Sequence, residues 1–208
     1  MSEQTQLAPI APEPEAKPIV QRAPIVAGDR GVQLRSMEEM YRFAVAVVNS
    51  GIYKDCPSPE VALIKIQAGA ELGLTPIWSL TNIFVVNGKP TVYGDALLGI
   101  VLGHPLCEDV IETFADGVAK CEVIRKGRAP VVRTFSEADA KKAGLFGKAG
   151  PWSQYPTRML AMRARTFACR DAFADALRGI ACAEEQRDIP APRMVRDVTA
   201  AVLPEVAQ

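Results

Sequence analysis

One segment, Gly150 to Asp171, constrains the chain most, because it predicts a helix with two apolar sides and two cationic ridges. Thr157, which follows a proline, can cap the start of this helix, and no proline or glycine interrupts residues 158–173. At about 100° per residue, four arginines form two stripes about 130° apart, and apolar side chains fill both intervals between them. The stripes are Arg158 with Arg165 and Arg163 with Arg170.

These arginines have no acidic neighbour within the segment before Asp171. An ordinary surface helix has one apolar stripe and mixes both signs of charge on its exposed face. Two interpretations stay open. Either an external anion supplies the countercharge, in which case phosphate suits the planar guanidinium group, or carboxylates from elsewhere in the chain supply it.

Charge is segregated along the chain, although its 24 basic and 24 acidic side chains cancel. Residues 1–119 contain 8 basic and 14 acidic side chains, a balance of −6, and residues 171–208 contain 4 and 7, a balance of −3. Residues 120–170 contain 12 and 3, a balance of +9. This middle segment predicts a local positive field that suits nucleic acid, and the two surfaces of opposite sign could favour head-to-tail self-association.

Local signals predict an α+β fold with a small antiparallel sheet, a hairpin and packed helices. β-Formers flank Asn87-Gly88, which is the strongest short-range hairpin signal, and three further β-type runs within residues 110–135 predict an antiparallel meander. Cap and stop residues predict helices over about 36–50, 58–72, 75–80, 94–102 and 136–143. The apolar pattern of the arginine helix is expected to continue to Glu185.

The 208 residues are enough for one domain with a sizeable core. We expect this domain to span residues 35–188 and to form oligomers. Residues 1–34 contain five prolines and no apolar period, so they are expected to be a disordered arm. Residues 189–208 are expected to be a short tail. No apolar run approaches the roughly 20 residues that span a bilayer, and the N-terminus does not resemble a signal peptide, so no membrane association is expected.

Few residues here could perform covalent chemistry. The five cysteines are widely spaced, which favours reduced thiols in a cytosol over disulfides or zinc, and Cys121 and Cys169 are expected in the core. The single histidine, His104, lies in a Gly-His-Pro turn and is expected to be structural. Because the chain also lacks phosphate-binding glycine motifs and a nuclease-like acid cluster, we expect a binding protein rather than an enzyme, with no cofactor or metal site. Whether a divalent cation assists binding stays open.

Basic and aromatic side chains interleave around a glycine-spaced loop at residues 144–150. Single-stranded nucleic acid needs cations along its backbone and aromatic surfaces for its bases, each worth about 1–3 kcal/mol. Trp152 and Tyr155 could supply these surfaces or could pack in the core. The candidate DNA-binding residues are Arg125, Lys126, Arg128, Lys141, Lys142, Lys148, Trp152, Tyr155, Arg158, Arg163, Arg165 and Arg170.

Two stretches resemble the RecT family of phage recombination proteins, namely Ile83 to Asp95 (IFVVNGKPTVYGD) and Gly144 to Asp171 (GLFGKAGPWSQYPTRMLAMRARTFACRD). The segment AGAELGLTP at Ala68 to Pro76 and the segment RTFSEADAKKAGL that follows the predicted meander also resemble that family. The resemblance covers roughly residues 36–186, with the motifs in the same order.

This resemblance implies an ATP-independent protein that binds single-stranded DNA, anneals it through a duplex intermediate and assembles as rings or helical filaments in the cytoplasm of a phage host. It also implies that the basic sheet turn, the glycine-rich loop and the arginine helix line one DNA groove, and that Asn87, Gly88 and Lys89 contact a neighbouring subunit. A phage exonuclease and a host single-strand-binding protein are the partners it suggests, although little sequence follows Glu185 to engage them.

Two other functions stay open at this point. A phage structural or assembly protein could polymerise through its oppositely charged surfaces without DNA. A nucleic-acid-processing enzyme could also carry a basic helix, and metal-dependent strand cleavage would reveal it.

Overall fold

The computed structural model describes residues 26–28 and 31–189, and within them the chain has the predicted α+β architecture. Most of the expected arm and tail lies outside these residues. Inside the arm, β1 (Val26–Gly28) and β2 (Gly31–Gln33) form an antiparallel hairpin. The expectation of disorder is therefore wrong for these two strands.

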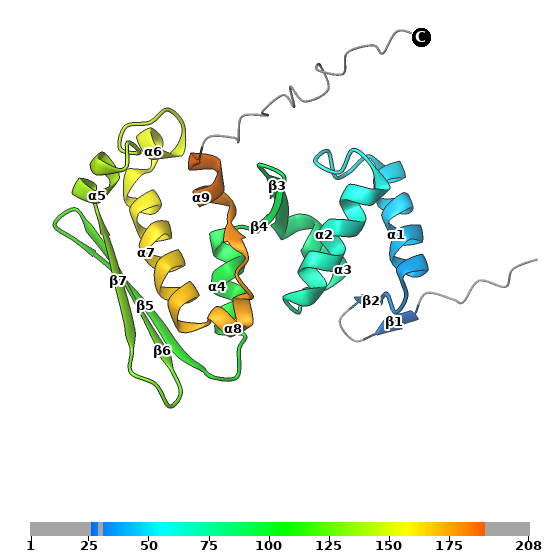
Figure 1. Ribbon diagram of the computed structural model, residues 1–208, viewed down its shortest axis with the longest axis horizontal. Coiled ribbons are helices and arrows are strands. Elements are labelled where there is room, and N and C mark those ends of the chain that lie inside the picture. Colours follow the sequence, from blue (N-terminus) through cyan, green and yellow to red (C-terminus); the bar gives the residue numbers. More distant parts are fainter. Residues whose placement is uncertain (1–25, 29–30, 190–208) are drawn as a thin grey trace, which may run out of the picture.

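Three helices in the first half of the chain pack around a small core of their own (Figure 1). They are α1 (Met37–Ser50), α2 (Pro59–Glu71) and α3 (Pro76–Asn82). The hydroxyl of Ser36 caps α1 by accepting a hydrogen bond from the N–H of Glu39, as the sequence predicts, and Gly51 ends the helix with a φ of 65°. Their core consists of the buried residues Ala44, Val47, Cys56, Ala62, Ile66 and Leu80.

The predicted Asn-Gly hairpin is present. It joins β3 (Ile83–Val86) to β4 (Lys89–Val92), and Asn87 and Gly88 have φ angles of 52° and 74°, the left-handed pair that a type I′ turn requires. β4 also pairs in parallel with β8 (Ala181–Cys182). The small sheet is therefore mixed rather than purely antiparallel, and it brings the end of the described chain beside its middle.

The predicted meander is also present, as β5 (Cys107–Ala115), β6 (Val118–Arg125) and β7 (Val131–Ser136). Alternate residues of β6, which are Ala119, Cys121, Val123 and Arg125, are buried on one face. Lys120 and Glu122 lie on the other face and pair with each other at 3.1 Å. α5 (Glu137–Lys142) follows β7 and begins with the predicted capping box between Ser136 and Asp139.

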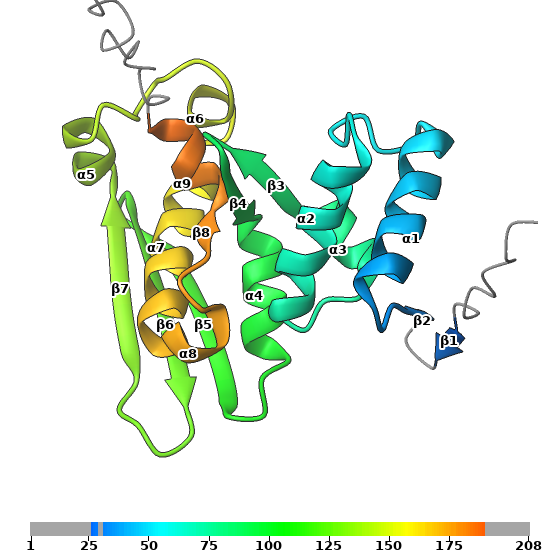
Figure 2. The ribbon, with the colours of Figure 1, turned by 45° about the vertical axis from the view of Figure 1, so that its right-hand side comes forward.

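The arginine helix is α7 (Pro156–Ala172), and it lies between the meander and α4 (Gly94–Leu102) (Figures 1 and 2). Its two apolar sides have different partners. The ring of Phe167 meets Phe135 of β7 with centroids 6.0 Å apart, whereas Met162 packs against Gly94 at the start of α4. A helix packed on two sides needs an apolar residue pattern on both, which accounts for its unusual sequence.

Two boundaries of this helix differ from the prediction. Tyr155 rather than Thr157 precedes its first residue, because the helix already begins at Pro156. It ends at Ala172 instead of continuing to Glu185. The left-handed backbone of Arg178 and Gly179, with φ angles of 49° and 76°, cannot belong to a helix and divides the remainder. Four short elements flank α7 in sequence, and these are α6 (Pro151–Gln154) before it and α8 (Ala174–Leu177), β8 and α9 (Ala183–Asp188) after it.

The cysteines have the environment expected from the sequence. All five are free, and Cys121 and Cys169 are completely buried. Burial raises the pKa of each of these two thiols to about 12, so they are protonated and unreactive at neutral pH. Among the helices in the described ranges, none combines the length and apolar character needed to cross a membrane.

Candidate nucleic-acid interface

Arg165 is the most deeply placed of the α7 arginines, with 8% of its surface exposed. Its guanidinium group donates two hydrogen bonds to Glu112 of β5, at 2.8 and 2.7 Å, and one to Asp95 of α4, at 2.6 Å. Burial alone would lower its pKa, but the hydrogen bonds and charges of Glu112 and Asp95 outweigh burial and raise the pKa. Arg165 therefore joins three elements, and the prediction that it holds phosphate is wrong, because its guanidinium group is buried and paired with carboxylates.

The other three arginines of α7 also have carboxylate partners. Arg158 donates to Asp95 at 2.8 Å, Arg170 donates to Glu185 at 2.7 Å, and Arg163 donates to Asp188. Carboxylates of the same chain therefore supply the countercharge of the α7 arginines, which is the second of the two interpretations left open by the sequence. Arg158 remains accessible, because 59% of its side chain is exposed.

Arg125 of β6 also has a structural role, contrary to its prediction as a DNA contact. Its guanidinium group forms a two-pronged pair with Asp175, at 2.6 and 2.7 Å, donates to the carbonyl of Ala172 at 2.8 Å and lies over the ring of Phe173. These contacts satisfy the end of α7 and fix the start of α8. The hydrogen bond from Arg125 lowers the pKa of Asp175 well below its ordinary range.

Trp152 and Tyr155 have opposite environments. Trp152 is 3% exposed, and its indole N–H donates to Asp188 at 3.1 Å, so the core interpretation holds for this ring. Tyr155 is 64% exposed at the junction of α6 and α7. Of the two predicted aromatic surfaces, only Tyr155 is available to a base.

The remaining predicted cations lie in two groups. Lys141 and Lys142 are on α5 and Lys148 is on the loop before α6, where Lys148 pairs with Asp188 at 2.9 Å. Lys126 and Arg128 are on the turn after β6, at the opposite end of α7. A helix of 17 residues separates these ends by about 25 Å, so the two groups cannot contact the same phosphate.

The predicted subunit contact at residues 87–89 is partly occupied by the same chain. The side-chain amide of Asn87 donates to the carbonyls of Gln186 and Ile189, at 3.0 and 3.1 Å. Asn87 therefore anchors the end of α9. Gly88 and Lys89 are exposed beside it and stay candidates for a contact with another subunit.

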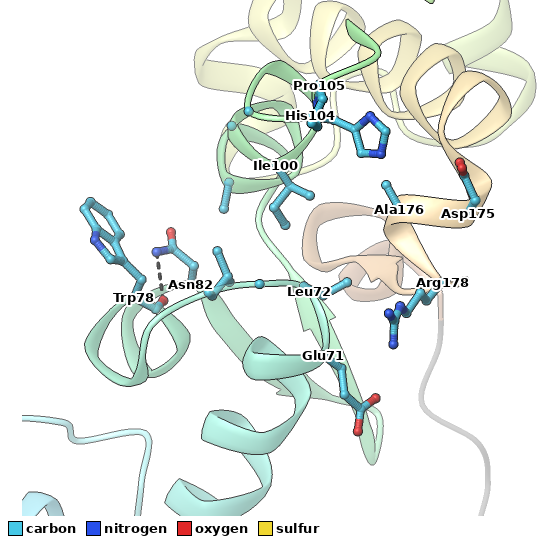
Figure 3. Close-up of a pocket in the computed structure, with 15 residues that line it drawn as sticks. Glu71, Leu72, Trp78, Asn82, Ile100, His104, Pro105, Asp175, Ala176 and Arg178 are labelled. Atoms are coloured by element: carbon cyan, nitrogen blue, oxygen red, sulfur yellow. Dashed lines mark hydrogen bonds between the residues drawn. The ribbon is translucent and has the colours of Figure 1, made fainter. Parts of the chain in front are cut away.

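The structure also contains a groove that sequence reasoning missed. An open cavity of about 650 Å³ lies between the α2–α3 side of the molecule and α4 with α8 (Figure 3). Trp78 and Asn82 of α3 line one wall, Ile100 and His104 line another, and Arg178 lies at one end. The ring of His104 packs against Phe173 with centroids 5.1 Å apart, and the predicted structural role of this histidine stays a prediction.

Two smaller hollows extend this groove. The first, of about 370 Å³, shares Asn82 with the main cavity and reaches Tyr93, Asp95 and Arg158. The second shares Arg158 and reaches Tyr155. The N–H of Lys126 donates to the carbonyl of Leu106, which follows the cavity-lining Pro105, so the basic sheet turn begins near the main cavity. The predicted residues that line these hollows are Arg158 and Tyr155, and the two groups of predicted lysines and Arg128 lie outside their linings.

Trp78 gives the main cavity an exposed aromatic surface. It is 62% exposed, although tryptophan is usually well buried in a folded protein. The sequence correctly predicts that Trp78 lies in the short helix after Thr75-Pro76. The position within a helix does not show which of its side chains the rest of the fold will bury. Its exposure depends on the arrangement of α3 against α4, which no local pattern encodes.

No protein-family model and no curated protein matches this chain.

Proposed function

We propose that this protein binds single-stranded DNA and anneals complementary strands without ATP, and that a strand lies in the groove between α3 and α4. The observation that carries the proposal is the pair of exposed aromatic rings, Trp78 and Tyr155, in neighbouring hollows that share lining residues and that also contain Arg158 and Arg178. Stacking surfaces interleaved with cations are what non-specific single-strand binding requires. The resemblance of residues 36–186 to the RecT family supports annealing as the outcome of binding.

The electrostatics of the groove are compatible with a polyanion. Four acids line the main cavity and the hollow that shares Asn82 with it, and these are Glu71, Asp95, Asp175 and Glu184. Two arginines line the same parts, Arg158 and Arg178, and two more, Arg125 and Arg165, pair with the lining acids from behind. Three arginines thus pair with two of these acids, Asp95 and Asp175, which reduces the negative charge that an entering strand meets. The exposed Lys126 and Arg128 then extend positive charge past one end.

Annealing requires that the base edges stay free while the backbone is held. Stacking on Trp78 and Tyr155 would leave the Watson–Crick edges outward, and arginine contacts would reduce the repulsion between two strands. We propose that neighbouring subunits extend the groove into a longer track, with Gly88 and Lys89 at the contact. An exonuclease and a host single-strand-binding protein stay predicted partners.

The proposal is tested by the affinity for a fluorescent oligothymidine, measured by anisotropy, together with annealing of complementary oligonucleotides followed by energy transfer. Trp78→Ala and Tyr155→Ala should each weaken binding about 5- to 150-fold, because each stacked base is worth about 1–3 kcal/mol. Phe114→Ala is the matched control, since Phe114 is also an exposed ring, on β5 away from the groove. If both groove variants bind as tightly as the parent protein, the strand does not lie there.

A further inference from the structure

The last described helix, α9, covers cations of α7 and its flanking loop with carboxylates. Glu185 pairs with Arg170 at 2.7 Å and lies 3.9 Å from Arg163. Asp188 accepts hydrogen bonds from Arg163 and from Lys148. Three cations that could bind a phosphate backbone are thus occupied by two acids from a helix of six residues.

Polar contacts hold α9 in place. Ala183 is its only buried residue, and the sequence Ala-Glu-Glu-Gln-Arg-Asp has no large apolar side chain. Its contacts with the rest of the chain include ion pairs, the stacking of Arg187 over two rings, and hydrogen bonds. Among the hydrogen bonds, Asn87 donates to the carbonyl of Gln186 and the N–H of Gly94 donates to Glu184. A segment held by ion pairs and hydrogen bonds, rather than by apolar burial, can be displaced by another anion that satisfies the same cations.

The ion pairs beneath α9 are also incompletely satisfied. Within the described residues, neither Nε of Arg163 nor Oε1 of Glu185 has a hydrogen-bond partner, although both atoms are buried. Burial raises the pKa of Glu185 despite the two nearby arginines. A buried group that lacks a partner costs free energy, so the closed arrangement is less stable than its number of ion pairs suggests.

We propose that α9 is an acidic strap that occupies the anion-binding side chains Arg163, Arg170 and Lys148 and is displaced by a polyanionic strand. This inference rests on the proposed function, because α9 would regulate the binding of DNA in the neighbouring groove. Glu184 lines the groove and Arg187 of α9 lies over the ring of Tyr93 at 5.2 Å, so movement of α9 would widen the groove toward α7. A strand that extends from the groove onto Arg163, Arg170 and Lys148 then competes with the strap, and closure lowers the apparent affinity.

The test uses the full chain and its Glu185→Gln/Asp188→Asn variant, which removes both carboxylates without changing side-chain size. Affinity for oligothymidine should rise about tenfold, because the competing closed state is weakened. Adding Arg163→Gln to that variant should remove most of the gain. The control is Glu122→Gln/Asp116→Asn, which removes two acids from the meander and should change affinity less than twofold.

A second measurement needs no substitution. Amide hydrogen exchange over residues 183–189 of the parent protein should speed up when oligothymidine is added, and also when salt is raised, because both weaken the ion pairs that hold the strap. If the variant binds no more tightly than the parent and the amides of α9 stay protected with DNA bound, the proposal that α9 is a displaceable strap is contradicted. The proposal that the protein binds DNA is not affected by that result.

Inorganic polyphosphate separates the two proposals. If the variant gains affinity for polyphosphate and the parent protein does not bind oligothymidine, the strap is supported and the proposed DNA function is contradicted. If the variant binds neither polyanion better than the parent, the strap is overturned.

Discussion

At the scale of single residues, the chain uses its arginines mainly to join its own elements. Arg165 connects α7 to β5 and α4, and Arg125 connects β6 to α8. Each sits on a buried face and finds its carboxylate 50 or more residues away in sequence. An isolated guanidinium group could not be buried at these places, because an unpaired charge in the interior costs several kcal/mol.

Arg165→Met should therefore destabilise the protein, by about 2 kcal/mol, because Glu112 and Asp95 would lose a buried partner while staying partly hydrated. Arg158→Met is the matched control on the same helix and the same Asp95, with an exposed guanidinium group. Its effect should be below about 0.5 kcal/mol. Urea unfolding followed by circular dichroism measures both, and equal effects would contradict the assignment.

Acid should weaken the contact between Arg125 and Asp175. The pKa of Asp175 is lowered in the folded chain, so its carboxylate stabilises the fold at neutral pH and this stabilisation is lost as the pH falls below the ordinary carboxyl range toward the lowered value. The difference in Tm between the parent protein and Asp175→Asn should thus shrink between pH 7 and pH 3. A difference that stayed constant or widened on acidification would count against the pair.

At the scale of elements, two helices can pack closely where a glycine of one helix faces the other helix, because glycine has no Cβ. Gly69 of α2 lies against Ser79 of α3, where an added Cβ would come within 2.1 Å of the hydroxyl oxygen and 3.0 Å of the backbone Cα. Gly99 of α4 has no heavy atom within 4 Å of the same position. The two glycines are alike in sequence context, since both are within helices, but only one permits two helices to approach.

Gly69→Ala should lower the free energy of unfolding, because α3 must move away, even though alanine favours the helix by about 1 kcal/mol. Gly99→Ala should raise it by about 0.5–1 kcal/mol, since nothing opposes the gain in helix propensity. Thermal unfolding of the two variants checks the prediction. Stabilisation by both substitutions would mean that α2 and α3 are not in tight contact.

At the scale of the whole molecule, the groove between α3 and α4 is the feature that the proposed function depends on. Its main cavity lies between the first three helices and the rest of the fold, and two further hollows share lining residues with it or with each other as far as Tyr155. Because all four arginines of α7 are internally paired, few cations are available to phosphates. Binding should accordingly show a modest salt dependence, with a slope of about −0.7 for each phosphate contacted.

Arg158→Gln/Arg178→Gln should weaken binding of a short oligothymidine about tenfold and reduce the salt slope, because both side chains line the groove. Lys120→Gln/Lys142→Gln removes the same charge from the outer sheet face and α5 and should change affinity less than twofold. The affinities of the two double variants for oligothymidine, measured at several salt concentrations, show which pair of cations contacts the strand. The reverse ranking would place the strand along the sheet and α5.

The sequence by itself determined the elements that depend on neighbouring residues. The left-handed Asn87-Gly88 turn, the Ser136 capping box and the meander follow from local backbone preferences, and all three are present as predicted. The two apolar sides of α7 likewise indicate that other elements pack on both sides of this helix, and the meander and α4 do so. These features could be predicted because their causes lie within a few residues.

Only the tertiary structure decided which countercharge the arginines of α7 receive, that Trp152 is buried while Trp78 is exposed, and where a groove opens. Asp95, Glu112 and Asp188 are 25 to 70 residues away from the arginines they contact. An excess of positive charge in one segment cannot reveal whether an external anion or a distant carboxylate neutralises it, since both satisfy the same guanidinium group. The choice depends on which elements the fold brings together.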